Sequence, residues 1–173
     1  MKRRIPLMLG MLIALAAIVL SACCPPLGQL TVPTVGYIPQ DWYLSDEEAY
    51  PNIVDQDGTH WGLIEYTDQV DYDFVQIYYG EMPSELIGHE NDANALIDRA
   101  IYESVTFDPE ETGTILIGSR LAGYAKAYDP SYEIYDMEIV FIIDSTCIDI
   151  YTVYDATSED EAQAMSLIDS IRP

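Results

Sequence analysis

Residues 121–154 read LAGYAKAYDPSYEIYDMEIVFIIDSTCIDIYTVY, and this stretch predicts three consecutive antiparallel strands. Aromatic and β-branched residues, which favour strands, are concentrated in three segments. These segments are residues 121–128, 135–143 and 147–154. The short polar links between them, Asp129-Pro130-Ser131 and Asp144-Ser145-Thr146, are typical of tight turns. The sequence therefore predicts an antiparallel meander at the centre of the fold.

Strand patterns also precede this stretch. A segment at 114–118 extends the meander to four strands, and residues 37–83 are mostly of strand type. Asp57-Gly58 between apolar segments predicts a hairpin turn. Residues 74–79 alternate strictly, so we expect Val75, Ile77 and Tyr79 on one face and Phe74, Gln76 and Tyr78 on the other. One of these two faces should be core.

Two segments have helical spacing instead. The first is expected over residues 92–104, with Asn91 or Asp92 as N-cap. Its expected buried stripe is Ala93, Leu96, Ile97, Ala100, Ile101 and Val105. The second opens with a capping box of Ser158 and Glu161. Its apolar side is expected to hold Met165, Ile168 and Ile171. Helices covering an antiparallel β-sheet give an α+β fold class in a single domain.

One family resemblance follows from these segments. Tyr37-Ile38-Pro39-Gln40-Asp41-Trp42 resembles the opening of PsbP-like domains. The later order is similar too, with Gly118, then Leu121-Ala122-Gly123-Tyr124, and a terminal helix ending at Ile168-Asp169-Ser170-Ile171-Arg172. The resemblance covers residues 37–173 and implies a PsbP-like α/β/α sandwich. It also implies a non-enzymatic, membrane-proximal accessory or binding role, without any photosystem partner.

The first 24 residues predict an export signal. Lys2, Arg3 and Arg4 precede an apolar run over residues 5–20, as in a secretory signal peptide. Leu20-Ser21-Ala22-Cys23 resembles the lipobox of lipoprotein precursors, which implies cleavage before Cys23 and lipidation of Cys23. The alternative, a transmembrane helix or uncleaved anchor, is disfavoured because a spanning helix needs about 20 apolar residues. Either alternative places the domain outside the cytoplasm, since positive charge stays inside.

The predicted organisation has three parts. Residues 1–22 form the signal peptide, residues 23–36 a Pro/Gly-rich tether, and residues 37–173 the PsbP-like α+β domain. Cys147 is expected to be a small buried hydrophobe, whereas Cys24, beside the lipidated residue, could be free, acylated or exposed. A disulfide between Cys24 and Cys147 has little support.

Charge excludes one class of partner. After removal of residues 1–22, four basic residues remain against 30 acidic ones, a net charge of about −26. A nucleic-acid-binding protein needs a basic surface, so this role is excluded. The acidity has three alternative explanations: adaptation to high salt, which the scarcity of lysine favours; cation binding; or repulsion from an anionic membrane. A solvated acidic surface without a specific task is the simplest interpretation.

No catalytic or metal site emerges from the motifs. Asp55-Gln56-Asp57-Gly58 fails as an EF-hand because Ile53 and Ile64 would fill ligand positions. Two acidic clusters remain as weak cation candidates, namely Asp68, Asp71 and Asp73, and Asp108, Glu110 and Glu111. His60 and His89 lie in no zinc-ligand spacing. No catalytic residue and no cofactor are therefore predicted.

Tyrosine is the remaining unusual feature, because the chain has 14 of them. Tyrosine suits both sheet faces and binding surfaces. The candidate ligand or partner surface consists of Tyr78, Tyr79, Tyr124, Tyr128, Tyr132 and Tyr135. The sequence thus predicts a membrane-anchored extracytoplasmic lipoprotein with a non-enzymatic binding domain for a protein, a glycan or a cation. The two rival hypotheses are a Ca²⁺-binding surface protein and a secreted hydrolase built from Ser119, His60 and an aspartate.

Overall fold

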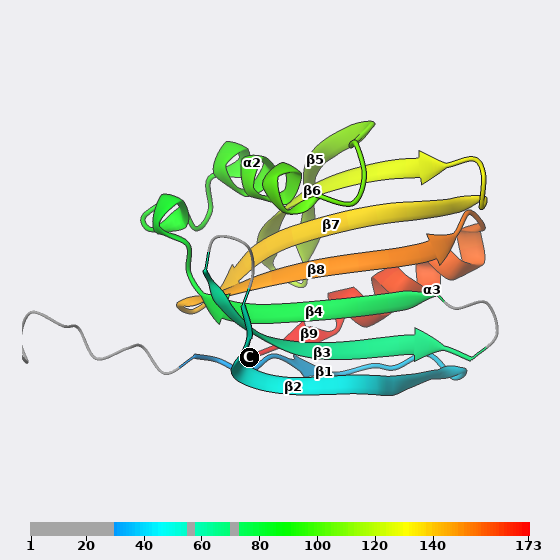
Figure 1. The fold of residues 1–173 in the computed structure, drawn as a ribbon, viewed down its shortest axis with the longest axis horizontal. Helices are drawn as coiled ribbons and strands as arrows, with labels where there is room; N and C mark the ends of the chain where they lie inside the picture. Colours follow the sequence, from blue (N-terminus) through cyan, green and yellow to red (C-terminus); the bar gives the residue numbers. More distant parts are fainter. Residues whose placement is uncertain (1–29, 55–57, 70–72) are drawn as a thin grey trace, which may run out of the picture.

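The computed structural model describes residues 30–54, 58–69 and 73–173. Its main feature is a seven-stranded, fully antiparallel sheet with the strand order β2-β3-β4-β8-β7-β6-β5. A second sheet has two strands, β1 and β9. Figure 1 shows the large sheet as the body of the molecule, with one helix on each of its faces.

The elements follow one another as two runs of strands, each followed by a helix. The strands are β1 (Thr34–Val35), β2 (Trp42–Val54), β3 (His60–Asp68), β4 (Phe74–Glu81), β5 (Glu111–Ile117), β6 (Arg120–Asp129), β7 (Ile134–Ile143), β8 (Thr146–Asp155) and β9 (Ile171–Arg172). The helices are the 3-10 helix η1 (Ser84–Leu86), α2 (Ala93–Glu103) and α3 (Ser158–Asp169).

The two runs of strands join where β4 pairs with β8, with Ile77 opposite Ile150. This pairing brings the last strand of the first run beside the last strand of the second run. It also places β8 at the centre of the sheet, between β4 and β7. The face of these middle strands toward α3 is apolar, whereas their face toward α2 also carries polar side chains such as Asp149 and Glu138.

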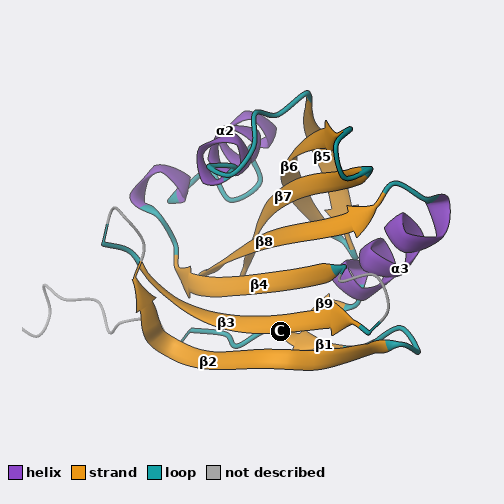
Figure 2. Cartoon of the chain, turned by 45° about the vertical axis from the view of Figure 1, so that its right-hand side comes forward, coloured by secondary structure: helices purple, strands orange, loops and turns teal. Residues whose placement is uncertain are grey.

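The sheet separates two hydrophobic cores. On the α3 face, buried residues of β3, β4, β7 and β8 pack against Leu167 and Ile168. On the α2 face, Leu96 and Ala100 pack with Val140 and Cys147. Figure 2 shows the two helices on opposite sides of the sheet. A substitution that weakens one core therefore leaves the other core in place.

The expectation of a PsbP-like α/β/α sandwich is wrong, because the described part of the chain is mostly antiparallel β-sheet and contains two α-helices. A helix of 11 or 12 residues is about 17 Å long and about 10 Å wide, enough to cover roughly two strands. Seven strands at about 4.8 Å spacing extend across about 29 Å. Neither face therefore carries a complete helical layer, and part of the α2 face stays accessible beside the helix.

Helix α2 lies close against β6. Asp92 is its N-cap, as expected, and accepts hydrogen bonds from the backbone N–H groups of residues 94 and 95. A Cβ at Gly123 would lie 2.3 Å from the Leu96 carbonyl carbon, so only glycine permits this approach. The expected buried stripe is partly wrong, because Ile101 and Val105 are exposed while Arg99 is buried. The apolar periodicity did not predict burial of Arg99, because arginine is classed as polar. In the folded protein its ion pairs stabilise the guanidinium in a buried position.

Two expectations at the ends of elements also need correction. Thr157, and not Ser158, is the N-cap of α3, and its hydroxyl accepts from the Asp160 N–H. Thr34–Val35, within the predicted tether, pairs with β9. The local sequence pattern could not predict the N-cap, because two neighbouring hydroxyl residues can both fill that position. It could not predict the strand at residues 34–35, because two residues have no periodicity.

Most predicted strands are confirmed to within a few residues. The alternation of residues 74–79 is confirmed, with Val75, Ile77 and Tyr79 buried. The hairpin between β2 and β3 is confirmed by the pairing of Val54 with His60, while residues 55–57 of its turn lie outside the described residues. Cys147 is fully buried, as expected. Cys23 and Cys24 lie outside the described residues, as does Asp71.

Candidate functional site

One pocket lies on the α2 face, beside the helix and over β4, β8 and β7. Helix α2 packs mainly on β5, β6 and β7 and reaches β8 only at Cys147, so it leaves the rest of this face over β8 and β4 uncovered. The register aligns polar side chains across these strands, with Tyr78 opposite Asp149 and Tyr151 opposite Glu138. A row of polar side chains therefore forms the floor of the pocket.

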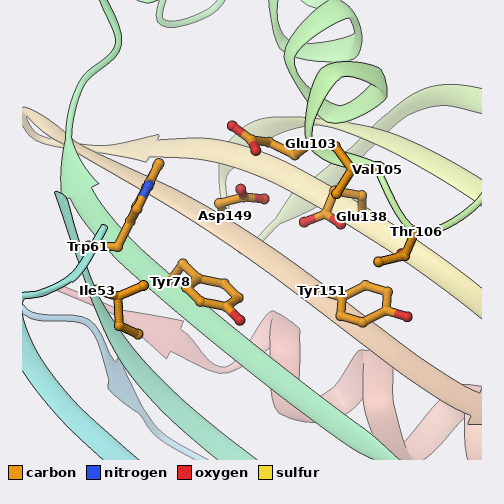
Figure 3. A pocket seen from close by; sticks show the side chains of 9 residues that line it. All are labelled: Ile53, Trp61, Tyr78, Glu103, Val105, Thr106, Glu138, Asp149 and Tyr151. Atoms are coloured by element: carbon orange, nitrogen blue, oxygen red, sulfur yellow. The ribbon is translucent and has the colours of Figure 1, made fainter. Parts of the chain in front are cut away.

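The cavity is about 270 Å³ in volume. Carboxylates of Glu103, Glu138 and Asp149 gather in its middle, as Figure 3 shows. Aromatic and apolar side chains surround them, and Figure 3 labels the complete lining. The lining consists of Ile53, Trp61, Tyr78, Glu103, Val105, Thr106, Glu138, Asp149 and Tyr151. We call this cavity the acidic-aromatic pocket.

Glu138 and Asp149 form a buried carboxyl pair. They are diagonal neighbours on β7 and β8, since Glu138 lies opposite Tyr151 and Asp149 opposite Val140. Their side chains are hydrogen-bonded, and the two residues are only 4% and 6% exposed. Burial raises the pKa of the Glu138 carboxyl well above its usual range, and the nearby Asp149 raises it further. The pair therefore retains a proton in a pH range in which surface carboxyls are ionised.

Arg99 lies next to the pocket and is 5% exposed. It forms ion pairs with Glu103 at the end of α2 and with Glu85 in η1, the latter at 2.9 Å between Nη1 and Oε1. Its charge is thus shared by two carboxylates that flank the pocket. Arg99 also interacts electrostatically with Asp149, so it is the basic side chain nearest to the buried carboxyl pair.

The tyrosine hydroxyls of the pocket already donate to protein acceptors. Tyr78 donates to Gln76 Oε1 at 3.1 Å, and Tyr151 donates to Asp136 Oδ1 at 2.7 Å. Gln76 in turn donates to Glu65 Oε2 at 2.6 Å. Burial raises the pKa of both Tyr78 and Tyr151 to about 12, so both hydroxyls stay protonated. The pocket consequently offers a ligand mainly hydrogen-bond acceptors and aromatic surface.

The structure does not bring the six predicted tyrosines together. Tyr78 lies in the pocket, whereas Tyr79 points to the opposite face and is buried in the α3 core. Tyr128 and Tyr132 line a separate shallow hollow, and the ring of Tyr128 lies 5.2 Å from that of Tyr135. The sixth tyrosine, Tyr124 on β6, donates its hydroxyl proton to Glu111 Oε1. Only Tyr78 among the six contributes to the acidic-aromatic pocket.

The rival hydrolase site is not assembled. His60 is the first residue of β3, and its Nδ1 lies 3.2 Å from the carbonyl oxygen of Pro51 in β2. Ser119 lies at the turn between β5 and β6, and three strands separate β3 from β6. Four strand spacings correspond to about 19 Å along the sheet, well beyond the reach of a hydrogen bond.

The acidic clusters do not form a cation site among the described residues. No group of three or more acidic, histidine or cysteine side chains in residues 30–54, 58–69 and 73–173 is arranged to hold a metal ion. Asp73 is buried and accepts from the Asp155 N–H at 3.0 Å. Glu111 accepts the Tyr124 hydroxyl proton. These carboxylates thus have partners within the protein.

Sequence reasoning missed Glu138, Asp149, Glu103 and Arg99. A signal for the first two was present, because each carboxylate lies inside an otherwise apolar central strand. A buried acid is rare and needs a partner or a task. The position of Glu103 could not be found this way, since it depends on how α2 packs on the sheet.

No family model matches this chain, and no curated protein matches it. The chain is similar to a solved crystal structure from Bacteroides thetaiotaomicron, with a TM-score of 0.50 and 9% sequence identity. The match covers 81% of this chain but only 44% of the other chain. At this identity the similarity concerns the fold alone. Within the described residues, no helix combines the length and apolar character needed to cross a bilayer.

Proposed function

We propose that this protein is a lipid-anchored extracytoplasmic binding protein whose ligand occupies the acidic-aromatic pocket. The observation that carries the proposal is the pocket itself. It is concave, has aromatic walls, and holds a few convergent polar groups, which is the usual composition of a small-molecule site. The buried Glu138–Asp149 pair adds a cost to folding that a binding role explains.

Anchoring rests on the first 24 residues, with their basic start, apolar run and lipobox-like Cys23. The start of the described chain adds a geometric argument. The Thr31 N–H donates to Thr146 Oγ1 at 2.8 Å, so this part of the chain lies beside the turn between β7 and β8. Cys147, next to that turn, belongs to the core beneath the pocket. The described chain thus begins beside the β7–β8 turn.

A non-catalytic role fits the geometry of the pocket better than hydrolysis. Covalent hydrolysis by a serine or cysteine needs that nucleophile beside a base. Serine, histidine and cysteine are absent from the pocket lining. Binding, and not bond cleavage, is the function that we assign.

The anchor is tested by replacing Cys23 and, separately, its neighbour Cys24 with serine. We expect Cys23→Ser to lose membrane association or to accumulate as unprocessed precursor, while Cys24→Ser fractionates like the wild type. Equal fractionation and equal gel mobility of Cys23→Ser and wild type would contradict lipidation.

The pocket is tested by a small-molecule screen read through the indole N–H signals of the two tryptophans. Trp61 lines the pocket, whereas Trp42 lies in the α3 core and donates to Gln163. A pocket ligand should shift the Trp61 signal and leave Trp42 unchanged. If compounds of every charge class leave Trp61 unshifted, the pocket is not a ligand site.

A further inference from the structure

We infer that this protein forms a symmetric dimer in which the β5 strands of two copies pair antiparallel along their open edges. The two seven-stranded sheets would then form one continuous sheet across a two-fold axis. Strand β5 is the last strand of the large sheet, and within the described residues it pairs with β6 alone. Figure 2 shows it at the opposite end of the sheet from β2. The inference goes beyond the proposed ligand binding and does not depend on it.

The open edge of β5 presents backbone groups that β6 does not bind. Ile117 pairs with Arg120, so the hairpin turn between them has two residues. The residues that flank such a turn exchange backbone hydrogen bonds, and every second residue along the ladder does the same. The N–H and C=O groups of Thr112, Thr114 and Leu116 therefore point away from β6. The side chains of these three residues are also exposed.

The two edges of the large sheet differ in their protection against another strand. Natural proteins commonly protect an edge with charges, proline or bulges. Strand β2 has all three, namely the acidic run Asp46-Glu47-Glu48, Pro51 and two irregularities in its register. Residues 112–116 of β5, Thr-Gly-Thr-Ile-Leu, have no charge, no proline and an unbroken register. The edge of β5 is therefore the one that another strand can join.

A second copy of the chain fits this edge in one register. Hydrogen-bonded pairs need outward-facing residues opposite one another, and a two-fold axis at Thr114 aligns all three of them. Thr114 then lies opposite its own counterpart, and Leu116 lies opposite Thr112 of the second copy, each pair exchanging two backbone hydrogen bonds. Leu116 is 65% exposed, and the methyl group of the facing threonine would cover part of it. The strand is thus complementary to itself.

The two ends of β5 carry opposite charges. Glu110 and Glu111 are exposed at the start of the strand. Arg120 lies in the hairpin at its other end and has no ion-pair partner among the described residues. Arg172 is close to the same turn, since a Cβ on Gly118 would lie 3.4 Å from its Nη1. Half of the basic side chains that remain after removal of the predicted signal peptide therefore lie at this end of β5.

Antiparallel pairing brings the acidic end of each copy beside the basic end of the other. With the axis at Thr114, Glu111 lies opposite Ile117 of the second copy and one strand further from Arg120 of that copy. Two strand spacings are about 10 Å, which a glutamate and an arginine side chain together can bridge. Asp169, the acidic residue at the basic end, already accepts a backbone N–H of the turn. The two acidic ends lie about 20 Å apart, beyond the Debye length of about 8 Å.

The register is tested by disulfide trapping in the full-length chain. Directly opposed residues of a hydrogen-bonded antiparallel pair lie about 5.5 Å apart at Cα, within the range that a disulfide spans. Thr114→Cys should therefore form a covalent dimer under mild oxidation. Leu116→Cys is the matched control, because this residue would lie about 14 Å from its own counterpart. Both variants also carry Cys24→Ser, which removes a competing thiol.

Sedimentation of the full-length protein in a mild detergent measures the dimer without a cross-link. We expect a species of twice the monomer mass at high protein concentration. Thr114→Glu should weaken association about tenfold or more, because like charges would face each other at the axis. Leu44→Glu adds the same charge at an exposed position of β2 and should dimerise like the wild type. Arg120→Glu should weaken association, and adding Glu111→Arg should restore it.

Three outcomes would overturn the inference. The first is a monomer at every concentration, which would leave the β5 edge to a strand of a different protein or to none. The second is a dimer that Thr114→Glu and Leu44→Glu weaken equally, since its interface would then lie elsewhere. The third is equal cross-linking, or no cross-linking, of both cysteine variants. All the single substitutions at residues 44, 114 and 116 are at exposed positions, so these variants should melt like the wild type.

Discussion

Replacing Gly123 with alanine tests how closely α2 must approach the sheet. A Cβ at this position would lie 2.3 Å from the Leu96 carbonyl carbon and 2.4 Å from the Ile97 nitrogen. Because carbon atoms in contact lie about 3.5–4.0 Å apart, the helix must move outward by about 1 Å. Backbone cannot rotate away as a side chain can, so the whole of α2 has to shift.

The expected cost follows from two opposing effects. Overpacking costs about 1–3 kcal/mol, and a clash with backbone belongs at the upper end of this range. Alanine also lowers the conformational entropy of the unfolded chain, and this offsets about 0.4–1 kcal/mol of the overpacking cost. We therefore expect the free energy of unfolding to fall by about 2 kcal/mol. For a domain of this size that lowers Tm by about 4–8 °C.

Thermal and urea unfolding followed by circular dichroism measure this change, and Gly113→Ala is the matched control. Gly113 lies on the neighbouring strand β5, where a Cβ would meet the ring of Tyr124 at 3.0 Å, and that ring can turn aside. We expect the control to lose less than about 0.5 kcal/mol. If Gly123→Ala is as stable as the wild type, the close contact between α2 and β6 is not a feature of the protein.

Three further predictions concern stability. Burial raises the pKa of the Asp73 carboxyl from 3.8 to about 7, so the folded state retains a proton that the unfolded state has lost, and stability falls as the pH rises through this window. The stability of Asp73→Asn relative to the wild type should therefore rise between about pH 4 and pH 7, and an unchanged difference in urea midpoints across this range would contradict the prediction. Thr157→Ala should cost about 1 kcal/mol by removing the α3 cap, whereas Ser158→Ala should change the melting temperature little. Arg99→Met should cost about 3 kcal/mol, the lower end for a broken buried pair, because the half-buried Glu103 loses its cation. Loss of the exposed partner in Glu85→Gln should cost under about 1 kcal/mol in the same urea titration.

The strands could be predicted because their information is local. Residues 134–143 and 146–155 have apolar side chains on both faces, and polar turns end them. Helix α2 was found for the same reason, with Asp92 as its cap. The expectation of a PsbP-like sandwich was wrong. It rested on short motifs such as Tyr37-Ile38-Pro39-Gln40-Asp41-Trp42, and such motifs do not determine how much of a sheet two helices cover.

The site could not be predicted in the same way. Tyr78 and Tyr79 are neighbours in sequence, yet the alternation of a strand sends them to opposite faces. Glu138 and Asp149 meet only because β7 and β8 pair in one particular register. A slip of one residue in either strand would move the carboxyl of that strand to the α3 core and separate the pair.

By itself, the sequence determined the elements whose causes lie within a few residues: strand alternation, turns, the acidic surface charge, and the lipobox-like segment at Cys23 that predicts the anchor. The tertiary structure alone decided which acids are buried. The pairing of β4 with β8 and the packing of α2 at Gly123 bring Glu103, Glu138 and Asp149 into one cavity. The burial and the pKa of these carboxyls depend on segments that are distant in the sequence. A local sequence pattern therefore cannot predict them.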